Sequence, residues 1–229
     1  MIAGVDGTPK GWVVVTSDDN FENPNVLLVK RLAELPRILR VAAVDVPSGL
    51  PEKGSRVADL LARKVLGEPR RRSVFPSPIR PVLGARSWEE ACARTERADG
   101  RKVSKQTFAI LPKVAEADEF VRSDSWARRI LHEVHPELSF AKWSGAPMAH
   151  GKKSTSGRKE RLVLITATFG SGVFERARGF LRGHHVGFDD LADAFAALWT
   201  AARICAGEAE MLPSERTVDA EGVAMQIWV

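Results

Sequence analysis

Four aspartates stand where their carboxylates can act together. Asp6 and Asp45 each follow a short apolar run, as expected at the end of a buried strand. Asp190 and Asp193 lie three residues apart in a segment with helical periodicity, so both face the same side of a helix. Carboxylates brought together repel one another and need a cation, and an oxygen-only ligand set favours Mg²⁺ or Mn²⁺.

Such a site predicts a particular reaction. Two ions held about 4 Å apart can activate a water molecule and stabilise the leaving oxygen in phosphodiester cleavage. Each acid also has a structural explanation, because an aspartate after a strand often begins a turn. Asp189 or Asp190 could cap a helix. Capping explains Asp193 poorly, since it lies on the apolar side of its segment.

Basic residues gather in two segments that suit a phosphate-rich ligand. One is the proline-rich loop at residues 68–84, and the other is the glycine- and serine-rich segment at residues 150–161. Arginine forks and helix N-termini both bind phosphate oxygens, although runs of charge also cover ordinary solvated surfaces. The candidates for substrate binding are Arg71, Arg72, Lys105, His150 and Lys152. Lys153 is the candidate for neutralising charge that develops on a phosphate.

Composition narrows the class of protein. The chain has 229 residues, 44% of them hydrophobic, and a net charge of +5, which are ordinary values for a globular domain. No apolar run approaches the roughly 18 residues that span a membrane, and no secretory signal precedes the first strand, which predicts a cytoplasmic protein. Cys92 and Cys205 lack a zinc-ligand spacing and are interpreted as structural.

The pattern of elements predicts an α/β fold. An antiparallel meander of three strands should be followed by a right-handed crossover to a parallel strand, which brings Asp6 and Asp45 to one edge of the sheet. The expected strands are Ile2–Val5, Gly11–Thr16, Asn25–Leu32, Val41–Asp45 and Ile130–Phe140, with a tail strand at Val223–Val229.

Helices are expected around this sheet. Residues 52–128 form a helical insertion within a single domain covering residues 1–229, and Pro112 should kink or interrupt one of its helices. A short helix is expected at Ala33–Arg40. The other expected helices are Ser55–Gly67, Ser87–Asp99, Ser104–Arg122, Lys159–Phe169 and Phe188–Ala206.

The order of elements resembles the ribonuclease H-like fold, and the chain resembles the DUF429 family, described as predicted nucleases of that fold. The matching segments include GVDGTPKGWVV, AAVDVPSGLPE, RRRSVFPSPIRPVL, EVHPELSF, HGKKSTSGRKERL and FDDLADAFAALWTA. The last segment also looks like the late helix of Holliday-junction resolvases. The resemblance implies a mixed five-stranded sheet and a metal-dependent nuclease. It places Asp6, Asp45 and Asp190 or Asp193 at the metal positions.

The segment EVHPELSF adds two candidates. In an extended strand Glu133, His135 and Glu137 would share one face, although Pro136 indicates that the strand ends or bulges there. Glu133 is expected to complete the metal site, and His135 to orient a water or bind phosphate. Ribonuclease H-like enzymes do not usually draw an acid from this strand, and a histidine beside a proline is often only a structural hydrogen-bonding group.

Three functions compete. The first is metal-dependent cleavage of phosphodiester bonds in DNA or RNA, with Mg²⁺ or Mn²⁺. The second is hydrolysis or phosphoryl transfer on a nucleotide or another small phosphate ester. Actin-like kinases begin with a similar strand and loop, but they duplicate the fold and this chain contains one copy. The third is a nucleic-acid-binding module without catalysis, in which some of the acids would normally be lost.

Overall fold

The computed structural model describes all of residues 1–229 and divides the chain into two compact units. The first unit contains Met1–Asp45, Ile130–Glu210 and Trp228–Val229. The second contains Val46–Arg129 and Met211–Ile227. The expected insertion at 52–128 falls in the second unit, which also takes in a C-terminal segment that the sequence did not assign to it. None of the helices combines the length and the apolar character needed to cross a membrane.

A five-stranded mixed sheet forms the centre of the first unit. Its spatial order is β3-β2-β1-β4-β5, with β1, β2 and β3 antiparallel and β4 and β5 parallel to β1. This is the sheet that the sequence predicted. The strands are β1 (Ile2–Thr8), β2 (Gly11–Ser17), β3 (Asn25–Val29), β4 (Val41–Val44) and β5 (Leu131–Glu133).

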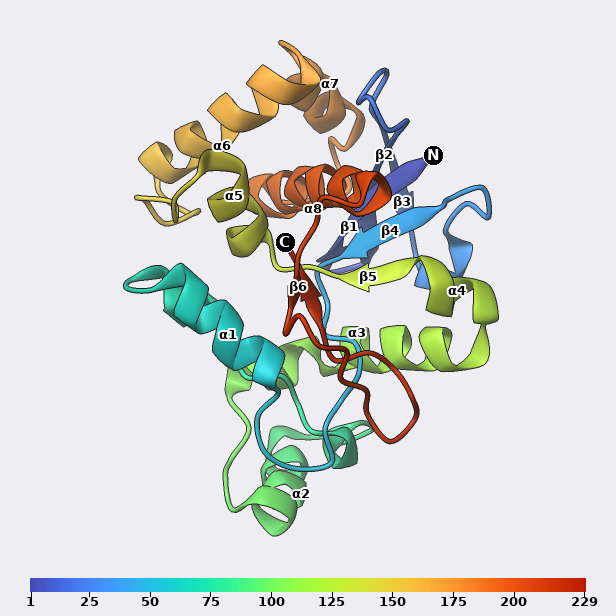
Figure 1. Ribbon diagram of the computed structural model, residues 1–229, viewed down its shortest axis with the longest axis vertical. Helices are drawn as coiled ribbons and strands as arrows, with labels where there is room; N and C mark the ends of the chain where they lie inside the picture. The colour runs from blue at the N-terminus through green and yellow to red at the C-terminus, as the bar shows by residue number, and fades with distance from the viewer. The chain divides into compact units, whose positions relative to one another are not determined.

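Helix α8 (Phe188–Ala206) packs directly on this sheet, and its bounds are those expected from the sequence. It contacts β1 most extensively and also touches β4, α5 (Pro136–Ser144) and α6 (Thr155–Phe169). In Figure 1 the helix lies across the strands, with α5, α6 and α7 (Val173–Phe180) beyond it.

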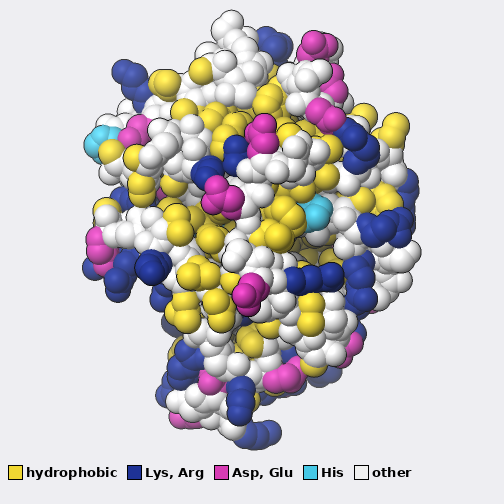
Figure 2. All heavy atoms as spheres, viewed as in Figure 1, with side chains coloured by type: hydrophobic (Ala, Val, Ile, Leu, Met, Phe, Trp, Pro, Cys, Tyr) yellow, Lys and Arg dark blue, Asp and Glu magenta, His cyan; other side chains and the backbone are white.

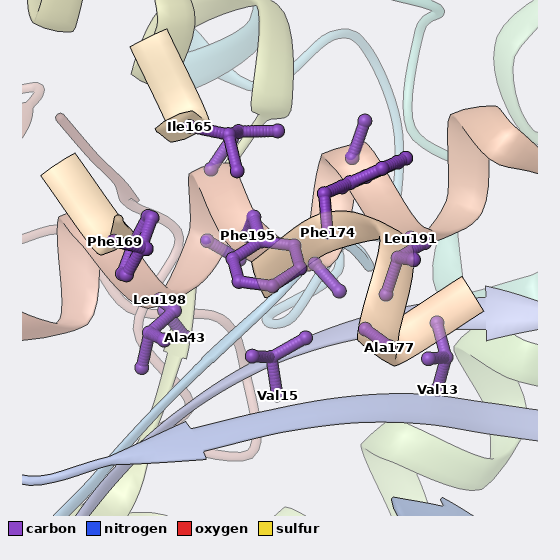
Figure 3. Packing of buried hydrophobic residues seen from close by; sticks show 14 of the residues in the cluster. Val13, Val15, Ala43, Ile165, Phe169, Phe174, Ala177, Leu191, Phe195 and Leu198 are labelled. Atoms are coloured by element: carbon purple, nitrogen blue, oxygen red, sulfur yellow. The ribbon is translucent and has the colours of Figure 1, made fainter. Parts of the chain in front are cut away.

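The core of this unit forms on both sides of α8. Figure 3 shows Phe195 of α8 above Val15 of β2, with Phe169 of α6 and Phe174 of α7 around the ring. Phe195 is fully buried, and burying a Phe side chain contributes about 1.5–3 kcal/mol. This packing holds α8 against β1 and β2.

The second unit is mainly helical. The ion pairs of Arg80 join its C-terminal segment to the rest, because the guanidinium lies 3.0 Å from Asp118 and 2.5 Å from Asp219. The Asp219 carboxylate also accepts a hydrogen bond from the amide of Leu50 at 2.9 Å. Its helices are α1 (Val57–Leu66), α2 (Trp88–Asp99) and α3 (Lys105–Ser123), followed by α4 (Ser125–Ile130), which leads into the first unit.

Three expected elements differ from the structure in type or over most of their length. The strand expected at Ile130–Phe140 is wrong beyond Glu133, because Pro136 begins α5. Proline suits the first helical position, where its missing N–H has no partner to lose. The helix expected at Ala33–Arg40 is only a 3₁₀ turn, Leu32–Glu34. The tail strand shortens to β7 (Ile227–Trp228), which pairs with β6 (Met211–Leu212).

Pro112 does not interrupt α3, which runs unbroken from Lys105 to Ser123. A proline removes a single backbone hydrogen bond of the helix. The adjacent Leu111 and Val114 are buried, and their packing offsets that loss.

Candidate active site

The carboxyl ends of β1 and β4 place two acids side by side. The strands are parallel with Val5 opposite Val44, so the next residues, Asp6 and Asp45, are neighbours on the same face. The amide of Asp45 donates to the carbonyl of Val5 at 3.0 Å, which continues the pairing to this point. The negative charge of Asp45 raises the pKa of Asp6, as expected for two neighbouring carboxyl groups.

A third acid comes from α8 through a close approach of helix and strand. A Cβ atom on Gly4 would lie 2.1 Å from the carbonyl oxygen of Ala194 and 2.1 Å from the amide nitrogen of Leu198. Only glycine permits this contact. Gly4 and Asp6 lie on the same face of β1, and the adjacent residue of α8 is Asp193, which is 2% exposed.

Lys152 supplies a positive charge to these acids. Its ammonium Nζ donates to Asp193 Oδ2 at 2.6 Å, and its charge also lowers the pKa values of Asp6 and Asp45. The side chain is 41% exposed whereas that of Asp193 is 3% exposed. Lys152 therefore lies at the solvent side of the cluster, with the aspartate beneath it.

Helix α6 anchors the loop that carries Lys152. The Glu160 carboxylate accepts hydrogen bonds from the amides of Ala149 and His150 at 3.1 and 3.0 Å. Gly157 packs so tightly on the loop that a Cβ there would lie 2.1 Å from the carbonyl oxygen of Gly151. These contacts fix the backbone from which Lys152 projects.

Glu137 is a fourth acid, which the sequence did not select. It lies in the first turn of α5, is 6% exposed, and accepts a hydrogen bond from Arg161 at 2.5 Å through Oε1. The Arg161 side chain is itself buried, with its guanidinium over the Phe140 ring at 5.1 Å. The second oxygen, Oε2, is buried without a hydrogen-bond partner. The charge of Glu137 raises the pKa values of Asp45 and Asp193.

Burial and mutual repulsion dominate the electrostatics of this cluster. Burial, followed by the charges of Asp45, Asp193 and Asp190, raises the pKa of Asp6 well above its usual value. Burial also raises the pKa of Asp45, against the effects of His135 and Lys152. The pKa of Asp193 rises to about 6 despite its contact with Lys152. These groups are held apart from water at an electrostatic cost that further cations would reduce.

The structure brings together most of the acids chosen from sequence. Asp6, Asp45 and Asp193 meet, and His135 lies close enough to influence the pKa of Asp45. Asp190 takes the structural role considered for it, because its carboxylate accepts a hydrogen bond from the amide of Gly187 at 2.9 Å, at the start of α8. Its charge nevertheless raises the pKa of Asp6.

Glu133 lies apart from this cluster. It stands opposite Val44 in the register of β4 and β5, whereas Asp45 is one residue further on. Successive strand residues point to opposite faces. Ala43 and Val134 belong to the core around α8, which places Glu133 on the other face of the sheet. The structure therefore does not bring Glu133 to the acids, whereas Glu137 lies close enough to act on Asp45 and Asp193.

The basic candidates are more scattered. Lys153 and His150 are exposed neighbours of Lys152, and neither is seen to contact the acids. Arg71 and Arg72 lie in the second unit, where both form ion pairs with Glu68, at 3.0 and 3.6 Å. Lys105, at the start of α3 in the same unit, lies over the Trp88 ring at 5.6 Å.

Basic side chains do not form one continuous patch on the face seen in Figure 2. Lys and Arg are interspersed there with acidic and apolar side chains. Arg161, which the sequence placed in a basic surface segment, is 1% exposed and binds Glu137 instead. The sequence did contain a signal for the position of Glu137. Pro136 precedes it, and proline is typical of the first turn of a helix, so a helix could have been expected to begin there.

The donors fit a hard divalent cation in their chemistry. They are carboxylates, and the buried Glu137 Oε2 has no hydrogen-bond partner. No three His, Cys, Asp or Glu side chains of the chain form a ready-made ligand set as they stand. Asp193 holds the Lys152 ammonium, and the raised pKa values of Asp6 and Asp45 mean that binding a metal would have to displace protons from these carboxyl groups.

Comparison with known proteins defines the family. The model of DUF429, a protein family of unknown function, matches residues 4–218. The chain therefore belongs to the DUF429 family, and the match includes all four acids of the cluster. Searches of curated proteins and of solved structures gave no significant match.

Proposed function

We propose that this protein is a metal-dependent nuclease that hydrolyses phosphodiester bonds in DNA or RNA with Mg²⁺ or Mn²⁺. The observation that carries the proposal is the gathering of Asp6, Asp45, Asp193 and Glu137 at one edge of the sheet. The strand order is the one that the resemblance to ribonuclease H-like proteins implies, which supports the same interpretation.

The roles of the side chains follow from their contacts. Asp6 and Asp45 would hold the metal, with Glu137 Oε2 as a further oxygen ligand. A bound divalent ion supplies an activated water and polarises the phosphate oxygen. Arg161 orients the Glu137 carboxylate, and the Lys152 ammonium neutralises Asp193 and offers its remaining protons to a phosphate oxygen.

A cleavage panel tests the proposal. Single-stranded and double-stranded DNA, RNA, hybrid and branched junctions are each incubated with Mn²⁺ or with EDTA, and an Asp45→Asn variant purified in parallel detects contamination. We expect cleavage that requires Mn²⁺ and is absent in the variant. Metal-independent binding to one substrate without any cleavage would contradict the proposal and favour a binding module. Turnover of small phosphate esters alone would redirect it to a nucleotide or similar substrate.

Glu137 and Glu133 form a matched pair of buried acids. Glu137→Gln removes a charge from the cluster, and we expect Mn²⁺ affinity and cleavage rate to fall roughly 10–100-fold, as for altered metal sites. Glu133→Gln changes the opposite face of β5, and both quantities should stay within about twofold of wild type. Calorimetry with Mn²⁺ and initial cleavage rates measure the two effects. Equal losses in both variants would refute the assignment of Glu137 over Glu133.

A further inference from the structure

Lys152 has the contacts of a bound cation. Its Nζ atom is 2.6 Å from Asp193 Oδ2, and its charge acts on Asp6 and Asp45 as well. All of these groups attract the ammonium strongly enough to raise the pKa of Lys152, against the opposing effect of burial. An ammonium and a divalent ion compete for the same carboxylate oxygens because both need several negative ligands nearby.

The position of this ammonium is fixed by the rest of the fold. Arg161 donates to the carbonyl of His150, two residues before Lys152, at 3.3 Å, and to Glu137 at 2.5 Å. The same guanidinium thus joins the lysine loop to the fourth acid. Ser154 continues this anchoring, because its hydroxyl and its amide both donate to the Gly151 carbonyl.

Once the opposite charges of the cluster are paired, the remaining negative charge matches one divalent ion. Arg161 neutralises Glu137 and Lys152 neutralises Asp193, each through a short contact. This pairing leaves Asp6 and Asp45, which lie side by side at the ends of β1 and β4. Two carboxylates match the charge of a single Mg²⁺ or Mn²⁺.

We propose that the Lys152 ammonium fills one cation position of the acidic cluster, so that the protein binds one divalent metal ion and uses the lysine where a two-metal site would hold the second. This inference rests on the proposed metal dependence. It follows that removing the lysine charge creates an additional divalent-ion site at Asp193.

The test counts Mn²⁺ ions bound to the folded chain. Wild type, Lys152→Met and Lys159→Met are stripped with EDTA, dialysed, and titrated with Mn²⁺ by calorimetry, with electron paramagnetic resonance of free Mn²⁺ as a second count. Lys159 is exposed on α6 and serves as the control for loss of one positive charge. We expect one ion in wild type and in Lys159→Met, and two in Lys152→Met.

A melting measurement accompanies the count. Without metal, Lys152→Met should melt below wild type, because Asp193 loses its partner, and saturating Mn²⁺ should raise its melting temperature more than that of wild type. Lys152→Arg keeps the charge and should bind as many ions as wild type, which covers the case in which Lys152→Met does not fold.

The outcomes separate this inference from the proposed function. If wild type and Lys152→Met bind the same number of Mn²⁺ ions, the inference is overturned. If both bind two ions, the inference is overturned but the proposed metal-dependent cleavage is not. An increase from zero to one would support Lys152 as a cation while removing metal dependence from the native protein. For Lys152→Arg, a gain of one ion would overturn the inference, because the charge is still present.

Discussion

The Asp6→Asn variant is expected to lose nuclease activity about 1,000-fold or more and, at the same time, to become more stable than wild type. Loss of a ligand oxygen removes several kcal/mol of transition-state stabilisation, which corresponds to that rate change. The asparagine side chain matches the size of the aspartate, and its amide group can donate a hydrogen bond to the neighbouring Asp45 carboxylate. Its amide carries no charge, so repulsion within the cluster falls.

The gain in stability has a definite dependence on pH. The folded-state pKa of Asp6 is raised by burial and by neighbouring acids, so its ionisation destabilises the fold at neutral pH. This destabilisation decreases as the pH falls towards the unfolded-state pKa, because Asp6 binds its proton at a higher pH in the folded protein than in the unfolded chain. Asp193, with a pKa of about 6, acts in the same direction between about pH 6 and 4. The stability advantage of Asp6→Asn should therefore be largest at the high end of the pH range and should shrink as the pH falls.

Chemical denaturation of both proteins from pH 5 to pH 8 measures this difference, which we expect to be roughly 1 kcal/mol at pH 8, within the usual range for stabilising changes. Comparing the two proteins cancels the opposite effect of His132. Burial lowers the pKa of His132 to about 4, so stability is lost as pH falls below about 6.5. A variant that is less stable at pH 8 would assign Asp6 a structural role in its turn.

The main features of the site could be predicted because they follow from short-range patterns. Apolar runs that end in Asp6 and Asp45, with a crossover between them, place both acids at one sheet edge whatever the details of the loops. The apolar periodicity of Phe188–Ala206 likewise defined α8 to the residue. The sequence argued against a helix-capping role for Asp193, because this residue lies among alanines. Its burial in the structure agrees with that argument.

The remaining features depend on where one element ends and the next begins, which a single residue can decide. The strand ends at Glu133 and α5 begins at Pro136, so Glu137 turns towards the acids while Glu133 points to the other face. Lys152 and Lys153 are adjacent and chemically identical. The anchoring of their loop by Glu160, Gly157 and Arg161 decides that Lys152 is the one that reaches Asp193. Such long-range contacts leave no periodicity in the sequence.

Gly4→Ala is expected to destabilise the first unit by about 3 kcal/mol or more, at the upper end of the usual range for overpacking. The added methyl carbon would lie 2.1 Å from two backbone atoms of α8 and 2.7 Å from Leu198 Cα. A side chain could rotate away from such a clash, but helix backbone cannot, so α8 must move off β1. The displacement separates Asp193 from Asp6, and folded molecules that remain should bind Mn²⁺ weakly.

Gly179→Ala is the matched control for this substitution. Gly179 lies in α7, is exposed, and has no atoms within 4 Å of an added Cβ. Alanine is favoured over glycine in helices by up to about 1 kcal/mol, so this variant should be slightly more stable than wild type. Guanidinium denaturation followed by tryptophan fluorescence and circular dichroism measures both. Both variants replace a glycine with alanine, so a loss of stability seen only in Gly4→Ala comes from the contact between β1 and α8. If Gly4→Ala matched wild type in stability, α8 would not approach β1 closely enough to bring Asp193 to Asp6, and the site built on that approach would have to be abandoned.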